Sequence, residues 1–318
     1  MFTIILDRFT QYATKEIYGR LAATGQTVFK IILTRMNHYD KGIIGYLMVV
    51  EYNEALYCGQ LLSGLGKDFA YRVPCKNSHH PFYFIIEPDD IEQLALTLFH
   101  LASVYDENDT KRLDYYDTEK NNFYFSCWDS VITPVCSGFL PVIAKLLEED
   151  NLNIVTAPAK LPKSNTVNRI RFVEFFGYTR ETLFQYLQLM ETRSLCLILD
   201  RFDNEVSYDA NTIAREFFHA AFVGEQIQAV CKCFSYLVPD LYSTKAFQFD
   251  VVTNNLQGLA DVLYETIRLK EATKEIYEHY HNKMDVFGES YSEGELDPAC
   301  HGLLDIFEDA AERAENNG

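Results

Sequence analysis

A polar stretch with spaced prolines interrupts the chain at residues 157–168, and it constrains the fold more than any other feature of the sequence. Pro158 and Pro162 lie there among lysine, serine and asparagine residues. Proline has no backbone N–H to donate, so this stretch is typical of a linker rather than of a core element. The chain has 318 residues, enough for two domains of about 100–200 residues each. We therefore expect a connector at 157–168 between two domains.

The part before the connector, 1–156, predicts an α+β domain. Hydrophobic residues make up 48% of the chain and aromatic residues 14%, which is enough apolar area for a packed core. Short β-branched and aromatic runs predict strands, and we expect a mainly antiparallel sheet with helices. The predicted strands are 2–6, 27–34, 42–50, 55–62, 69–73 and 82–86, with a hairpin turn at 52–54. Helices are expected over 10–23 and after Asp90, whose carboxylate suits an N-cap.

The part after the connector, 169–284, predicts a mostly helical domain with a short βαβ-like start. Strands are expected over 169–176 and 194–199, with a helix over 179–192 between them. Beyond Asp209 the pattern predicts the helices 210–222, 225–237 and 256–281. Two short self-similarities, 5–9 with 198–202 and 13–18 with 272–277, do not extend to a repeat unit, so no repeat architecture is expected.

The last segment, 285–318, is an acidic tail that holds ten acidic residues and one basic residue, Arg313. We expect its glycine-bearing part, 287–298, to be mobile and a terminal helix to form over 303–314. A segment with this charge is also a candidate surface for a basic partner protein.

Charge and hydropathy exclude several classes of partner. The net charge of −18 argues against binding to nucleic acid or to an anionic membrane, because phosphate contacts need a basic surface. No run approaches the roughly 18 apolar residues of a membrane span, and no signal peptide is recognisable.

The eight cysteines lack a disulfide-type spacing, which favours thiols in a reducing compartment. We expect a cytoplasmic protein, or one delivered into a host cytosol without a cleavable signal peptide; the oligomeric state stays open.

Cys127 is the candidate nucleophile. A helix is expected to begin at this residue, after a polar loop at 106–122. The positive end of a helix dipole lowers the pKa of a thiol, and a histidine base completes a nucleophilic site. His80 or His38 would be that base, and Asp114 or Asp117 would orient it. The predicted reaction is the cleavage of an amide or ester through a cysteine thioester.

The segment from His80 to Gly138 carries a set of motifs in a recognisable order. A strand runs into the acidic helix entry 87–90, Tyr115 and Tyr116 follow in a polar loop, and the order ends with the pair Cys127-Trp128, Val131 and Gly138. This order resembles the C-terminal half of bacterial papain-like hydrolases of the NlpC type, including permuted forms similar to lecithin retinol acyltransferase. The resemblance implies a papain-like fold for 1–156 and activity as a cysteine hydrolase or acyl transferase.

Other motifs do not predict a metal or a cofactor. Cys231 and Cys233 are too close for a zinc pair, as are His279 and His281, and 64–68 departs from the phosphate-loop pattern. Asp200 and Asp203 follow the predicted strand 194–199 and could hold a metal ion there. Two acids after one strand are common, however, so they do not predict a metal site. We therefore expect neither metal nor cofactor. The alternative to an enzyme is a non-catalytic acidic effector or inhibitor that binds a basic surface of a partner protein.

Overall fold

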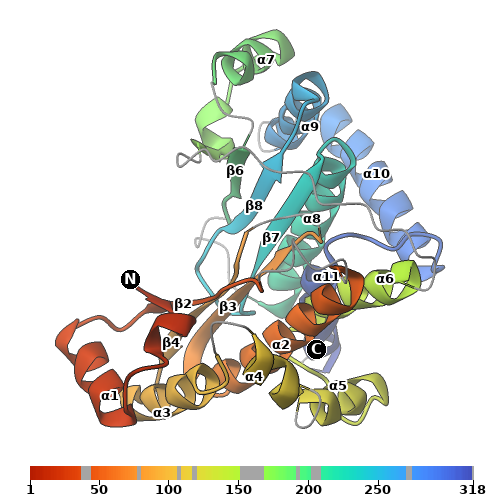
Figure 1. Cartoon of the computed structure of the whole chain (residues 1–318). Coiled ribbons are helices and arrows are strands. Elements are labelled where there is room, and N and C mark those ends of the chain that lie inside the picture. Colours follow the sequence, from red (N-terminus) through yellow and green to blue (C-terminus); the bar gives the residue numbers. More distant parts are fainter. Residues whose placement is uncertain are drawn as a thin grey trace. The chain divides into compact units, whose positions relative to one another are not determined.

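The computed structural model of the chain (Figure 1) describes residues 1–36, 44–76, 80–105, 109–116, 120–150, 168–190, 194–201, 209–269 and 274–316. The chain divides into two units, Met1–Ala159 and Lys160–Gly318, which we call unit 1 and unit 2. The expected connector lies outside the described residues except for Asn168. The predicted α+β class is confirmed, and no described helix is long and apolar enough to cross a membrane.

Unit 1 builds a mixed sheet with the strand order β1-β2-β4-β3. β1 and β2 are parallel, whereas β2 pairs with β4, and β4 with β3, in antiparallel fashion. Its elements are β1 (Phe2–Ile5), η1 (Leu6–Phe9), α1 (Thr14–Ala23), β2 (Phe29–Leu33), α2 (Ile44–Ser63), β3 (Gly66–Pro74), β4 (Phe82–Pro88), α3 (Ile91–Ala102), α4 (Thr110–Tyr115), α5 (Asn121–Trp128), η3 (Ser137–Phe139) and α6 (Leu140–Asp150). Asp90 caps α3 as expected, because its Oδ1 accepts the backbone N–H of Glu92 at 2.7 Å.

Helix α2 replaces the two strands and the hairpin predicted for 42–62, and that prediction is wrong. The run from Val50 to Leu56 is buried without interruption, so the helix has no solvent face along these turns. A helix that is buried on all sides has no alternation between a polar solvent face and an apolar face, so its sequence does not show the 3.6-residue period and resembles a pair of buried strands. The polar residues of this run, Glu51, Asn53 and Glu54, are buried as well and take part in hydrogen bonds.

Unit 2 has the strand order β7-β8-β6-β5, with β5 and β6 parallel and the other neighbouring pairs antiparallel. Its elements are β5 (Asn168–Arg171), η4 (Phe172–Phe175), α7 (Arg180–Leu189), β6 (Ser194–Leu199), α8 (Ala210–Ala229), β7 (Cys233–Pro239), β8 (Phe247–Val252), α9 (Leu256–Arg268), α10 (Lys274–Ser292) and α11 (His301–Asn316). The helix predicted for 225–237 is wrong, since α8 ends at Ala229 and β7 begins at Cys233. Every residue of β7 is buried, so this strand shows no alternation of apolar and polar residues.

The two units share one topology (Figure 1). β1-α1-β2-α2-β3-β4-α3 corresponds in order to β5-α7-β6-α8-β7-β8-α9, and the sheet order and strand directions agree. The helix packing agrees too: α1 packs on α3 and α6 on α2 in unit 1, while α7 packs on α9 and α11 on α8 in unit 2. The chain therefore contains a structural duplication. The self-similar pairs in the sequence do not mark it, because Ile5 lies in β1 whereas Ile198 lies in β6.

The duplication extends to side chains in both cores. Tyr71 Oη accepts the backbone N–H of Gly138 at 3.1 Å, and Tyr236 Oη accepts that of Gly302 at 3.1 Å. Each tyrosine belongs to a stacked row of rings across the two antiparallel strands of its unit. The rows are Tyr71, Phe69 and Phe84 in unit 1, and Tyr236, Phe234 and Phe249 in unit 2.

The acidic C-terminal segment is part of the fold of unit 2. Phe218 of α8 contacts Phe287 of α10 and Phe307 of α11, with ring centroids 5.4 and 4.9 Å apart. The expectation of a mobile part at 287–298 is wrong over 287–292, because α10 continues to Ser292 and Phe287 is buried. The apolar side chains of this segment, rather than its charges, decide that it packs.

Candidate functional site

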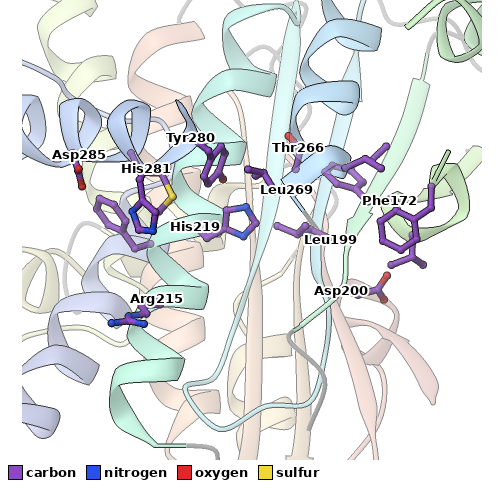
Figure 2. A pocket seen from close by; sticks show the side chains of 15 residues that line it. Phe172, Leu199, Asp200, Arg215, His219, Thr266, Leu269, Tyr280, His281 and Asp285 are labelled. Atoms are coloured by element: carbon purple, nitrogen blue, oxygen red, sulfur yellow. The ribbon is translucent and has the colours of Figure 1, made fainter. Parts of the chain in front are cut away.

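A cavity of about 530 Å³ lies in unit 2 among η4, β6, α8, α9 and α10 (Figure 2). Its volume falls in the range of about 300–1,000 Å³ that is typical of small-molecule sites. The apolar part of its lining consists of Phe172, Val173, Phe176, Leu199, Phe218, Ile267, Leu269 and Met284. The polar part consists of Asp200, Arg215, His219, Thr266, Tyr280, His281 and Asp285.

Helical spacing explains how two helices supply most of the polar groups. Arg215 and His219 are four residues apart on α8, and such residues lie on the same helix face. Tyr280 and His281 come from α10. Met284, four residues after Tyr280 and three after His281, lies on the same side of this helix. Figure 2 shows the His219 ring at the centre of this group, with Tyr280 and His281 on one side and Leu199 on the other.

Asp200 directly follows β6 and has one hydrogen-bonded and one unpartnered carboxylate oxygen. Its Oδ1 accepts a hydrogen bond from the exposed guanidinium of Arg171 in β5. Its Oδ2 is buried and has no hydrogen-bond partner. A buried carboxylate oxygen without a donor costs folding free energy. Asp200 is therefore a polar group of the cavity wall that has capacity for one more donor.

Tyr280 is the second cavity residue with an unpartnered buried oxygen. Its ring meets the rings of His219 and Phe222 edge-on, with centroids 5.6 and 5.3 Å apart. Its Oη is buried and makes no hydrogen bond, and burial raises the pKa of the Tyr280 hydroxyl well above its ordinary value. The hydroxyl is thus neutral, and it can both donate and accept.

Unit 1 has a buried ion pair that fixes how the two units correspond. Arg35, two residues after β2, donates its Nε to Glu51 of α2 at 2.7 Å. Arg201, two residues after β6, donates its Nε to Glu216 of α8 at 2.6 Å. From these pairs, Thr34 corresponds to Asp200 because each precedes its arginine by one residue. Glu54 likewise corresponds to His219, because each follows its glutamate by three residues.

At the corresponding place, unit 1 holds its own cationic side chains. The Glu54 carboxylate accepts from Arg112 Nη2 at 2.5 Å and from Lys120 Nζ at 2.9 Å, and all three side chains are buried. Arg112 Nη2 also donates to the carbonyl oxygen of Thr34 at 3.2 Å. The guanidinium of unit 1 therefore bridges the two positions that correspond to His219 and Asp200, both of which line the cavity of unit 2.

Burial alone would raise the pKa of Glu54, but Lys120 and Arg112 together hold the pKa of this carboxyl below its ordinary value of 4.5. Arg112 also lies over the Tyr105 ring, 4.3 Å from its centroid. The cluster is thus a carboxylate, a guanidinium, an ammonium and an aromatic face. Arg112 belongs to α4 and Lys120 is the N-cap residue of α5, whereas the single long helix α10 follows α9 in unit 2.

The structure places the predicted catalytic cysteine in the last turn of a helix. α5 begins at Asn121 and ends at Trp128, so the prediction that a helix begins at Cys127 is wrong. The thiol is buried, and burial raises its pKa. The negative end of the helix dipole lies at this end, and it does not favour a thiolate.

The other predicted site residues are distributed as follows. His80 lies two residues before β4, and Asp114 is an exposed residue of α4. His38 and Asp117 lie outside the described residues, as does Asp203. The described residues contain no group of three or more histidine, cysteine or acidic side chains arranged to hold a metal ion.

Two residues of the cavity were candidates in the sequence, Asp200 through its place after a strand and His281 as one of a pair of histidines, and neither was expected to hold a metal. Nothing in the sequence linked Asp200 to His219 or Tyr280, which are separated from it by long stretches of chain. Comparison with known proteins adds no candidate: no family model, no curated protein and no solved structure matches the chain.

Proposed function

We propose that this protein binds a small organic molecule in the cavity of unit 2. The observation that carries the proposal is the combination, in one cavity, of an apolar lining with two buried oxygens that lack hydrogen-bond partners, Asp200 Oδ2 and Tyr280 Oη. Small-molecule sites typically combine an apolar surface with a few polar groups that orient the ligand.

The energetics support a ligand at this place. A buried polar atom without a partner costs about 1–3 kcal/mol, and a ligand that supplies hydrogen bonds removes this cost. Apolar surface buried on both partners contributes about 25 cal/mol per Å² to binding. The two contributions act together, because the unpartnered oxygens line the same cavity as the phenylalanine and leucine side chains.

A cavity-filling variant tests the proposal. Met284→Trp adds a large ring to the cavity wall, and Leu189→Trp adds the same ring at a residue of α7 whose side chain is 83% exposed. A fragment library is screened against the wild type by ligand-observed NMR, and the hits are titrated into both variants by calorimetry. We expect hits whose binding survives in Leu189→Trp and is lost in Met284→Trp. Hits that bind all three proteins equally, or no hits at all, contradict the proposal.

A second proposal concerns a basic partner protein. It is supported by the fact that the acidic residues of α10 and α11 lie on well-formed helices, where Glu289, Glu312 and Glu315 are exposed. Ordered acidic groups hold a fixed spacing toward a basic surface, and their attraction weakens with salt. The triple variant Glu289→Gln, Glu312→Gln, Glu315→Gln should bind a lysine-rich peptide more weakly than the wild type in 50 mM salt. Equal binding by the two proteins contradicts this second proposal.

The cysteine hydrolase hypothesis for Cys127, and the resemblance that suggested it, stay predictions, as does the cytoplasmic location. They are independent of the cavity, because Cys127 belongs to unit 1 and the cavity to unit 2.

A further inference from the structure

We propose that the ligand of the unit 2 cavity is an organic cation, with an ammonium, amidinium or guanidinium group joined to an apolar body. This inference rests on the proposed function and adds the chemical class of the ligand. It follows from the duplication, because unit 1 shows what the same place in the fold accommodates when the chain fills it with its own side chains.

The first step is the occupant in unit 1. The Arg112 guanidinium donates to the Glu54 carboxylate and to the Thr34 carbonyl, and its central carbon lies over the Tyr105 ring. Lys120 adds an ammonium to the same carboxylate. In unit 1, a guanidinium and an ammonium group therefore occupy the space between the end of β2 and the middle of α2.

The second step is the set of acceptors in unit 2. Asp200 takes the place of Thr34, so a charged carboxylate replaces a neutral residue at the strand end. Its unpartnered Oδ2 is buried and can accept a hydrogen bond from an N–H donor. A charge-assisted hydrogen bond from a cationic N–H is stronger than one from a neutral group, and Asp200 Oδ2 is open to such a donor while Oδ1 pairs with Arg171. The residue whose counterpart in unit 1 accepts from Arg112 through its backbone carbonyl thus adds a side-chain acceptor to the cavity wall of unit 2.

The third step is the rest of the cavity lining. Phe172 and Phe218 supply aromatic rings, and Tyr280 adds a third ring and an unpartnered hydroxyl that can accept from the ligand. Aromatic faces attract cations, most strongly where water is excluded. The Tyr105 ring under Arg112 in unit 1 is the same pairing within the chain. The net charge of −18 further attracts cations toward the protein.

Arg171, which pairs with Asp200 Oδ1, is not part of the cavity lining, and Arg215, which is part of it, lies away from Asp200. Figure 2 shows Asp200 and Arg215 on opposite sides of His219, and the Arg215 side chain is exposed to water, which screens its charge. His281 is also exposed, and Asp285, an exposed acid of α10, lies beside it in the lining. His219 takes the place of Glu54, and either nitrogen of an imidazole ring can take part in a hydrogen bond. An anionic ligand placed at Asp200 would face an acceptor with no donor.

A matched series of probes tests the class of ligand. Phenethylammonium and benzamidine carry the proposed cationic groups, phenethyl alcohol is neutral, and phenylacetate is anionic. Binding of each to the full chain is measured by calorimetry and by the shift in melting temperature. Two variants accompany the wild type: Asp200→Asn, which keeps an acceptor for Arg171, and Glu278→Gln, which removes an exposed acid of α10.

We expect the two cations to bind the wild type and Glu278→Gln alike, and to bind Asp200→Asn about tenfold or more weakly. Tighter binding of phenethyl alcohol or phenylacetate, or cation binding that Asp200→Asn leaves unchanged, overturns the cationic class; the small-molecule proposal survives if Met284→Trp abolishes that binding. If neither these probes nor the fragment library binds in the cavity, both proposals fail.

Discussion

The Cys136 thiol lies in the space that a Cβ atom on Gly59 would occupy. Unit 2 repeats the arrangement with Cys300 and Gly224. In both units the segment that leads into the last packed helix crosses the long central helix at a glycine, and the cysteine side chain fills the gap. A close approach of this kind requires the residue without a side chain.

Gly224→Ala should lower the free energy of unfolding by about 1–3 kcal/mol, since an added methyl group in a well-packed core forces its neighbours to move. The added Cβ would meet Cys300 Sγ and, at 2.9 Å, the Phe249 ring. Urea unfolding measures the loss. Gly19→Ala is the control: this glycine lies within α1 with nothing near its missing Cβ, and the substitution should be neutral or slightly stabilising. Adding Cys300→Ala to Gly224→Ala should recover part of the loss, whereas strictly additive effects would contradict the contact.

Glu54→Gln should destabilise the protein by about 3–5 kcal/mol, because it removes the buried carboxylate that Arg112 and Lys120 share and leaves Arg112 with Asp109 as its acidic partner. The pKa of Glu54 is lowered in the folded state, so its stabilising effect is complete above the unfolded value near 4.5 and is lost as the pH falls through the folded pKa. The stability of the wild type should therefore fall more steeply below about pH 4.5 than that of Glu54→Gln.

Chemical unfolding at a series of pH values measures both effects. Glu278→Gln removes an acid whose contact with Lys274 is on the surface, and it should change stability by less than about 0.5 kcal/mol at any pH. If the difference in free energy of unfolding between the wild type and Glu54→Gln stays constant across the acidic range, the cationic neighbours do not lower the pKa of the Glu54 carboxyl.

Cys127 should react slowly with iodoacetamide at pH 7, because burial raises the pKa of its thiol and only the thiolate attacks. The rate should rise about tenfold per pH unit below that pKa. Mass spectrometry of the native protein locates and times the adduct, with the buried Cys136 as an internal reference. Fast labelling of Cys127 alone at pH 7 would be the result that the hydrolase hypothesis requires.

Deletion of 285–318 should lower the melting temperature or abolish the cooperative unfolding of unit 2. The deleted residues include Phe287, Leu303 and Leu304, which are buried. The variant with Glu312→Gln and Glu315→Gln, which changes only exposed acids of α11, should melt within a few degrees of the wild type. An unchanged melting temperature after the deletion would show that α11 does not belong to the core.

Local sequence patterns were sufficient to predict a helix or strand where one face of the element meets solvent or where a capping residue fixes its end. The expected strands at 2–6, 27–34, 82–86 and 194–199 coincide with β1, β2, β4 and β6, and Asp90 caps α3 as its position predicted. Local patterns failed for α2 and β7, which are buried on all sides. Without a solvent face the apolar residues have no characteristic period, so helix and strand are not distinguishable from sequence.

The sequence by itself determined the α+β class, the N-cap of α3 and the acidic character of α10 and α11, because each depends on neighbouring residues or on composition. Only the tertiary structure decided that Asp200, His219 and Tyr280 share one cavity, and that Arg112 and Lys120 enclose Glu54 at the corresponding place in unit 1. The physical reason is that these groups are brought together by the packing of whole helices on a sheet. The two units have the same topology, but side chains fill this place in unit 1 and a cavity lies there in unit 2. That difference depends on contacts between residues that are far apart in the chain.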